Sequence, residues 1–255
     1  MANWSDPRTG AAPYGQSDVR AASFDAGLRS YMLSVYNHML SGVLLTGIVA
    51  MLFGKSQSLM SVLFALRETA RGYTLAPTPV GWLVMLAPLG IVLAMNFGMA
   101  RFSAAALKGM FYAYAALLGA SLSTIFVAYT DSSIAQVFFG TAAGFAALSL
   151  WGYTTKKDLS GLGTFLIMGL VGILIAMLVN LFLQSGTMSM IISVLGVLVF
   201  AGLTAYDTQK IKSVYAYVGG TAQQEKAVVM GALELYLDFI NMFLFLLRLF
   251  GSSRD

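Results

Sequence analysis

Two acidic residues stand four positions apart in an apolar stretch near the end of the chain, "LELYLDFINMFLFLLRLF" at 233–250. On a helix this spacing places Glu234 and Asp238 on one face. An ionised carboxylate in apolar surroundings is costly unless a proton or a cation compensates it. Asp238 lies near the middle of the stretch, so we expect it to face protein or water and to carry out proton or cation chemistry.

Three further polar residues accompany this stretch. Asp207 closes the preceding apolar segment, Arg101 follows an earlier one, and Asn241 follows Asp238 by three residues. Arginine and a carboxylate can form two parallel hydrogen bonds. We therefore expect Arg101 to pair with Asp238 and, in a poorly hydrated pathway, to plug it. The single histidine, His38, is expected to be a hydrogen-bonded structural residue.

The composition is that of a membrane protein. Hydrophobic residues make up 58% of the 255 and charged residues 10%, against ~25% charged in soluble domains. The mean hydropathy is +0.77. The chain has no cysteine, which excludes disulfides, thiolate metal sites and thiol catalysis. Its net charge of +4 fits basic membrane loops better than nucleic-acid binding.

The elements that must position these residues are apolar helices, each about 20 residues long. Seven segments qualify, at about 31–53, 81–100, 107–129, 133–153, 162–184, 188–207 and 228–250. The sequence predicts an all-α, seven-helix transmembrane domain over 26–255, preceded by a flexible polar tail over 1–25. Charges in the seventh segment make it a poor lipid-facing helix, so we expect it in the middle of the bundle or re-entering the membrane.

Two local features carry additional expectations. Residues 58–72, "SLMSVLFALRETARG", are predicted to form a short helix at the membrane interface. The G-x-x-x-G motif of Gly140 and Gly144 predicts close packing between helices.

Lysine and arginine counts predict the orientation of the chain. With a cytoplasmic N-terminus, ten basic residues fall inside and five outside. The inside set is Arg8, Arg20, Arg29, Arg101, Lys108, Lys156, Lys157, Lys210, Lys212 and Lys226, and the outside set is Lys55, Arg67, Arg71, Arg248 and Arg254. Because cytoplasmic loops carry the excess of basic residues, the count favours an N-terminus inside the cell.

Soluble catalytic motifs are absent from the sequence. It contains no G-x-S-x-G, no H-E-x-x-H and no P-loop, so we expect no enzyme of those classes. Two membrane aspartates, Asp207 and Asp238, would suit an intramembrane aspartyl protease, but the glycine-rich motif expected near the second aspartate is missing. A proton-coupled transporter remains a further alternative.

Two motifs in combination resemble a known family. "FAGLTAYDTQKI" at 200–211 and "GALELYLDFINMFLFLLRLFG" at 231–251 closely resemble the Bax inhibitor-1 family, the transmembrane BAX-inhibitor-motif proteins, and in particular its bacterial YccA/YetJ-like branch. The resemblance covers about 31–251. It implies a bundle of seven helices in the bacterial inner membrane, with the last helix in the centre and wrapped by the other six.

The resemblance also implies a function and a site. Members are associated with a pH-sensitive calcium leak, in which two aspartates that share a proton match Asp207 and Asp238. An arginine latch that closes the pore matches Arg101. Glu234 and Asn241 are further candidates for the ion path, since the second span lacks the acid that some members carry there. No tightly bound cofactor is implied, and calcium would be the permeant or bound ion, with Asp207 and Asp238 as its ligands.

Physical chemistry agrees with this expectation, and one alternative accompanies it. Two carboxylates in a poorly hydrated site cannot both ionise cheaply, so they titrate as a unit. Calcium prefers oxygen ligands and would compete with protons for the same carboxylates. Some bacterial relatives instead restrain a membrane-anchored ATP-dependent protease through the polar N-terminal tail, a role for which residues 1–25 would be suited.

Overall fold

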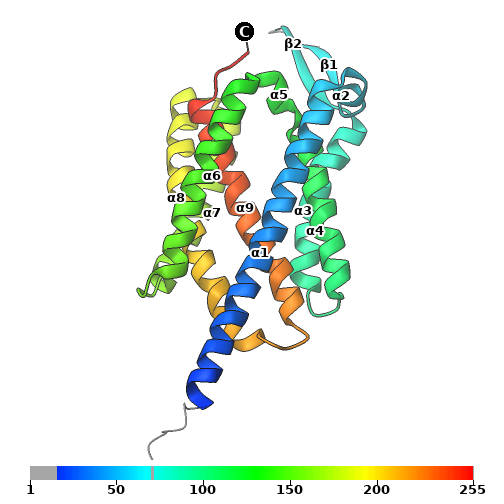
Figure 1. Cartoon of the computed structure of the whole chain (residues 1–255). Coiled ribbons are helices and arrows are strands. Elements are labelled where there is room, and N and C mark those ends of the chain that lie inside the picture. Colours follow the sequence, from blue (N-terminus) through cyan, green and yellow to red (C-terminus); the bar gives the residue numbers. More distant parts are fainter. Residues whose placement is uncertain (1–15, 70–71, 255) are drawn as a thin grey trace, which may run out of the picture.

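A computed structural model describes residues 16–69 and 72–254 of the chain, and within these ranges seven helices are long and apolar enough to cross a membrane. Their order confirms the predicted all-α bundle (Figure 1). The helices are α1 (Gln16–Lys55), α3 (Pro79–Gly98), α4 (Ala104–Ser121), α6 (Asp131–Thr154), α7 (Ser160–Leu183), α8 (Gly186–Val218) and α9 (Gln224–Phe250). The third span is completed by η1 (Leu122–Thr124) and α5 (Ile125–Ala128).

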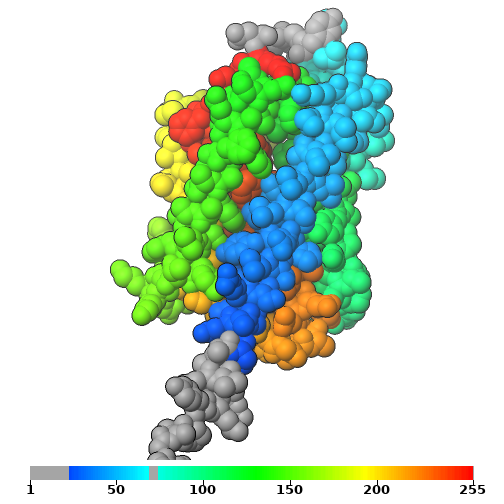
Figure 2. All heavy atoms as spheres, viewed as in Figure 1, coloured from blue at the N-terminus to red at the C-terminus, as the bar shows by residue number. Residues whose placement is uncertain are grey.

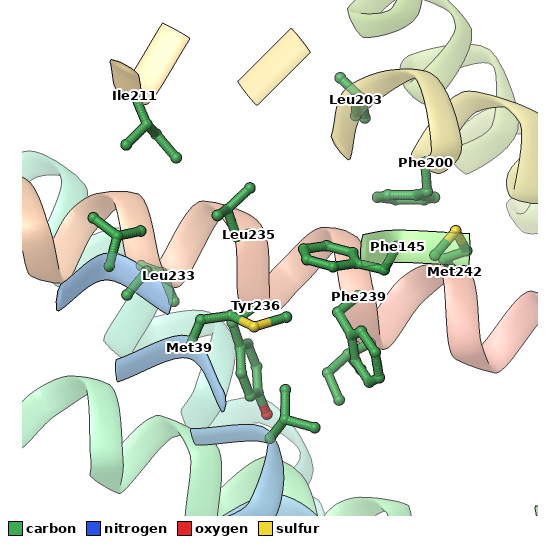
Figure 3. Close-up of a cluster of buried hydrophobic side chains, with 14 of the residues drawn as sticks. Met39, Phe145, Phe200, Leu203, Ile211, Leu233, Leu235, Tyr236, Phe239 and Met242 are labelled. Atoms are coloured by element: carbon green, nitrogen blue, oxygen red, sulfur yellow. The ribbon is translucent and has the colours of Figure 1, made fainter. Parts of the chain in front are cut away.

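The last helix, α9, lies in the centre of the bundle. In its most apolar window 72% of the residues are buried, against 11–39% in the other six spans. Figure 3 shows why: Tyr236 and Phe239 of α9 pack toward Met39 on one side, and Phe200 and Leu203 lie across the helix on the other. A helix that carries acid inside a membrane is therefore surrounded by protein, as the sequence predicted. It runs unbroken from Gln224 to Phe250 and does not turn back.

Hydroxyl side chains mark the start of several spans. Thr78, Ser103, Thr130 and Ser185 precede α3, α4, α6 and α8, and each accepts a hydrogen bond from a backbone N–H in the first turn. Such caps satisfy donors that have no partner within the helix, and so they fix where the helix begins. The connections that end at Ser103, Thr130 and Ser185 are short, and this keeps the helices on either side of them antiparallel.

The segment between α1 and α3 departs from the prediction. Only α2 (Gln57–Leu63) is helical, and it is followed by an antiparallel hairpin of β1 (Phe64–Thr69) and β2 (Gly72–Pro77). Phe64 adopts extended backbone and is buried with Leu63, which ends the helix. The two strands then satisfy each other's backbone groups. The predicted interfacial helix is wrong beyond Leu63, and residues 70–71 lie outside the described ranges.

Three other differences concern boundaries and packing. Helix α8 continues eleven residues beyond Asp207 because Ile211 and Tyr215 carry its buried face onward to Val218. Helix α1 already includes 16–25, and only 1–15 of the predicted tail lie outside the described part of the chain. Gly140 and Gly144 face open space. The close helix contact is instead at Gly152, where a Cβ atom would collide with the backbone of Ala205 on α8.

Candidate functional site

The carboxyl groups of Asp207 and Asp238 meet between α8 and α9. They lie within hydrogen-bonding contact of each other. Asp238 is 3% exposed, and its Oδ2 atom has no hydrogen-bond partner among the residues described. An ionised carboxylate only accepts hydrogen bonds. A hydrogen bond between two carboxyl groups therefore requires that one of them hold a proton.

The helical hairpin of α8 and α9 explains why these two residues meet. Asp207 lies eleven residues before the end of α8 at Val218, and Asp238 lies fourteen residues after the start of α9 at Gln224. With a rise of ~1.5 Å per residue on both helices, the two positions reach similar heights above the connecting turn. The antiparallel packing of α8 on α9 then sets the two side chains opposite each other.

An ion pair stands one helical turn from the aspartates. Lys210 Nζ donates to Glu234 Oε1 at 2.9 Å, and both side chains remain partly exposed. Lys210 follows Asp207 by three residues and Glu234 precedes Asp238 by four, so each partner stacks on one aspartate. Lys210 is also close enough to Asp207 to interact with it electrostatically. The cation nearest to the aspartate pair is thus Lys210.

A cavity of about 450 Å³ between α7, α8 and α9 holds this group. Its polar lining is Asp207, Lys210, Glu234, Asp238 and Asn241, with the ring of Tyr206 beside them; the rest is apolar. Four of the predicted site residues therefore share one cavity. Asn241 donates to the backbone oxygen of Leu237 on its own helix at 2.8 Å.

The two ends of the cavity differ. Toward the α6–α7 turn, Tyr206 and Lys210 also line a second cavity of about 320 Å³, together with Lys156, Lys157 and Asp158. Toward the other end, the rings of Phe200 and Phe245 stack with centroids 5.9 Å apart. The aspartates thus lie between a charged end of the cavity, at Lys210, and an aromatic end, at Phe200 and Phe245. We call the charged end the mouth.

The predicted latch residue, Arg101, lies elsewhere. It is exposed on the turn between α3 and α4, its backbone N–H bonds Gly98, and within 16–69 and 72–254 its side chain makes no ion pair. Lys226 of α9 reaches this turn through the oxygen of Met99. Asp238 is twelve residues further along α9, about 18 Å at the rise of a helix. The structure does not bring Arg101 to Asp238.

Comparison with known proteins agrees with this architecture. The family model described as "Inhibitor of apoptosis-promoting Bax1" matches residues 28–255. The chain belongs to the Bax inhibitor-1 family. It is 44% identical to the inner membrane protein YbhL of Escherichia coli K12, over 90% of this chain and 94% of YbhL. It is also 44% identical to the uncharacterized protein RP147 of Rickettsia prowazekii, over 91% of this chain and 94% of that one.

In this Bax inhibitor-1 family member, the acids do not form a compact metal centre. Among the described residues, no three His, Asp or Glu side chains converge closely enough to hold a metal ion. Calcium takes six to eight oxygen ligands, and Asp207 and Asp238 supply two carboxyl groups that already contact each other. Any further oxygen ligands for calcium at this site would have to come from water or the backbone.

A chain of hydroxyl groups, which sequence reasoning does not identify, lies behind the aspartates. Tyr36 of α1 bonds Ser149 of α6 at 2.6 Å, and Ser149 bonds Thr208 of α8 at 2.9 Å. Thr208 directly follows Asp207, so this chain of hydroxyls ties α1 and α6 to the site. His38 makes the expected hydrogen-bond contact, with its Nδ1 atom 2.9 Å from the Ser34 backbone oxygen.

Proposed function

We propose that this Bax inhibitor-1 family protein is a pH-sensitive, calcium-permeable leak channel, with the Asp207–Asp238 pair as its proton-controlled gate. The observation that supports the proposal is the contact between a fully buried carboxyl group and a second one, inside a cavity at the centre of the bundle. Such a pair needs a shared proton. A divalent cation can take the place of that proton because it compensates the negative charge of the two carboxylates.

The proposed mechanism follows from charge. Loss of the shared proton leaves two negative charges side by side in a medium of low dielectric constant, which is unfavourable unless a cation enters. Calcium supplies that charge and binds carboxylate oxygens. Protons and calcium then compete for the same atoms. The calcium concentration for half-maximal flux should therefore fall as the pH rises.

In the proposed channel, the ion pair at the charged mouth closes the pathway in this conformation. Lys210 places a positive charge beside the aspartates, and its bond to Glu234 joins α8 to α9 at the entrance. A calcium ion approaching Asp207 meets that charge first. Passage then requires the ion pair to separate. An Arg101 latch would need a second conformation in which the α3–α4 turn lies near Asp238.

We also propose that the N-terminus faces the cytoplasm of a bacterial inner membrane. Basic residues concentrate at the end of the bundle where α1 begins, which is also the end of the α3–α4, α6–α7 and α8–α9 turns (Figure 1). The chain lacks cysteine, so single cysteines report topology directly. Lys156→Cys should be protected from an impermeant thiol reagent in intact cells, and Ser252→Cys should react. The reverse pattern would invert the orientation.

Calcium flux in vesicles tests the gate. The purified protein is reconstituted with a trapped calcium indicator and the rate is measured across a pH series. Asp207→Asn and Asp238→Asn should each abolish the pH dependence, because an amide cannot share the proton. Glu225→Gln, an exposed acid on α9 outside the cavity, is the matched control. Unchanged flux and pH profile in both asparagine variants would refute the gate.

A further inference from the structure

A groove between α1 and α6 runs along the opposite side of α9 from the aspartate cavity. Helix α1 packs mainly on α4 and α9, and α6 on α8 and α9, so the two helices leave a gap. In Figure 2, α9 is visible between α6 (green) and α1 (blue). The gap contains a cavity of about 610 Å³ whose lining includes Arg29, Met39, Ala146, Ser149, Tyr153 and Phe239. We call it the α1–α6 groove.

The groove has the length of one membrane leaflet. Its lining on α1 extends from Arg29 to Leu40, and on α6 from Ala142 to Tyr153. Eleven residues of helix span ~16 Å, and half of a ~30 Å hydrocarbon core is ~15 Å. Leu33, Leu40 and Leu150 on its rim are more than half exposed, as lipid-facing side chains are. An extended acyl chain fits this shape.

The charge at one end of the groove selects the head group. Arg29 is exposed there and has no ion-pair partner within the described ranges. Lys212 adds a second cation: its ammonium donates to the Tyr153 backbone oxygen and lies 4.9 Å from the centre of that ring. Arginine binds phosphate through a planar fork of donors. Arg29 on the groove lining and Lys212 beside the lining residue Tyr153 together complement an anionic phosphate.

The other end of the gap is different. A smaller cavity of about 330 Å³ continues there past Phe239 to Lys55. The Lys55 ammonium is already paired with Asp131 at 3.0 Å. The Arg254 guanidinium pairs with the same carboxylate at 2.7 Å. Both cations at this end therefore already have an acidic protein partner, unlike Arg29.

We propose that the α1–α6 groove binds one anionic phospholipid, with its phosphate on Arg29 and Lys212 and an acyl chain along Met39, Ala146 and Phe239. This site goes beyond the proposed channel activity and does not depend on it. Two residues connect the groove to the neighbourhood of the aspartates on the far side of α9. Phe239 follows Asp238 in sequence, and Ser149 bonds Thr208, which follows Asp207. An acyl chain in the groove would hold α1, α6 and α9 in their present packing.

Photolabelling in vesicles tests the site without any flux measurement. The full-length protein is reconstituted with phosphatidylglycerol that carries a diazirine on one acyl chain, and labelled residues are located by mass spectrometry. We expect labels on Met39, Ala146 or Phe239, several-fold stronger than with the same probe on phosphatidylcholine. Equal labelling by the two lipids would overturn the anionic preference, and absence of label from the groove would overturn the site.

Two pairs of variants sharpen the test. Arg29→Gln should reduce phosphatidylglycerol labelling to the phosphatidylcholine level, whereas Lys108→Gln, an exposed lysine at the same end outside the groove, should not. Ala146→Trp should fill the groove and abolish labelling, whereas Ala147→Trp on the neighbouring face of α6 should keep it. Folding is checked by monodispersity in detergent. Full labelling of a folded Arg29→Gln and Ala146→Trp would overturn the proposal.

Discussion

Lys210 Nζ lies 2.9 Å from Glu234 Oε1, and each residue is one helical turn from an aspartate of the buried pair. The two contacts form consecutive links between α8 and α9. The outer link is a charge-assisted hydrogen bond with access to water, and the inner link is the contact between two carboxyl groups, one of which is buried. In the proposed channel, a cation must displace the outer link before it reaches the inner one.

The first prediction concerns the positive charge of the outer link. Lys210→Gln removes repulsion toward an entering cation, and a unit charge about one turn away in a partly solvated site is worth ~1–2 kcal/mol. We expect the calcium concentration for half-maximal flux to fall about tenfold. The measurement is calcium-indicator flux in vesicles at fixed pH, with Lys108→Gln as the matched control.

The same assay compares the two candidate cations. In the present conformation Lys210 contacts the site and Arg101 does not. Arg101→Gln should therefore leave the pH profile unchanged, while Lys210→Gln shifts it. If the Arg101 variant shifts the profile and the Lys210 variant does not, the latch forms in another conformation and Lys210 is only a structural partner.

The second prediction concerns stability at the inner link. Asp207→Ala leaves the buried Asp238 without its partner and should cost ~1–3 kcal/mol, as expected for an unsatisfied buried polar group. The double variant Asp207→Ala/Asp238→Ala should cost less than the sum of the two single variants, because neither residue then lacks a partner. Thermal unfolding in one detergent at one pH measures the cycle. Additive costs would show that the two carboxyl groups are not coupled.

The burial of Asp238 within protein could be predicted from the sequence alone. This residue falls in the middle of an apolar run, where a carboxylate must have protein or water around it, and the structure buries it. The central position of α9 follows from the same reasoning. Both the burial of Asp238 and the central position of α9 can be predicted because an unpaired charge in contact with lipid is energetically costly, however the helices pack.

Other parts of the site depend on packing that a single sequence does not reveal. The apolar pattern predicts that α8 ends at Asp207 and so places Lys210 in a loop, whereas the buried Ile211 and Tyr215 show that the helix continues. Ser149 and Thr208 carry no sequence signal of their own, since serine and threonine in membrane helices commonly bond their own backbone. Arg101 lies far from Asp238 because its turn meets α9 at Lys226, twelve residues before Asp238.

The third prediction concerns the aromatic end of the cavity. The Phe200–Phe245 stack is buried, and the ring of Phe245 fills the space beside Gly196, where a Cβ atom would contact it closely. We expect this aromatic pair to obstruct ion passage at its end of the cavity. Phe245→Leu should therefore raise calcium flux several-fold at every pH, at a stability cost of ~1 kcal/mol. The pH midpoint should not move, because the aspartates are untouched. Phe250→Leu, an exposed ring on the same helix, is the control. A shifted midpoint with unchanged flux would contradict a barrier role.

The fourth prediction separates the hydroxyl chain behind the site from the gate itself. Ser149→Ala deprives both Tyr36 and Thr208 of a partner, although Thr208 keeps its bond to the Thr204 oxygen. The expected cost is ~1–2 kcal/mol of unfolding free energy, and adding Tyr36→Phe should cost little more, because its partner is already gone. Ser34→Ala, which removes a bond within α1 only, should cost less.

The same variants also test whether these hydroxyl groups take part in gating. Because Tyr36, Ser149 and Thr208 lie outside the aspartate cavity, the pH midpoint of flux should stay constant. A midpoint that moves with Ser149→Ala would instead make these hydroxyls part of the proton pathway.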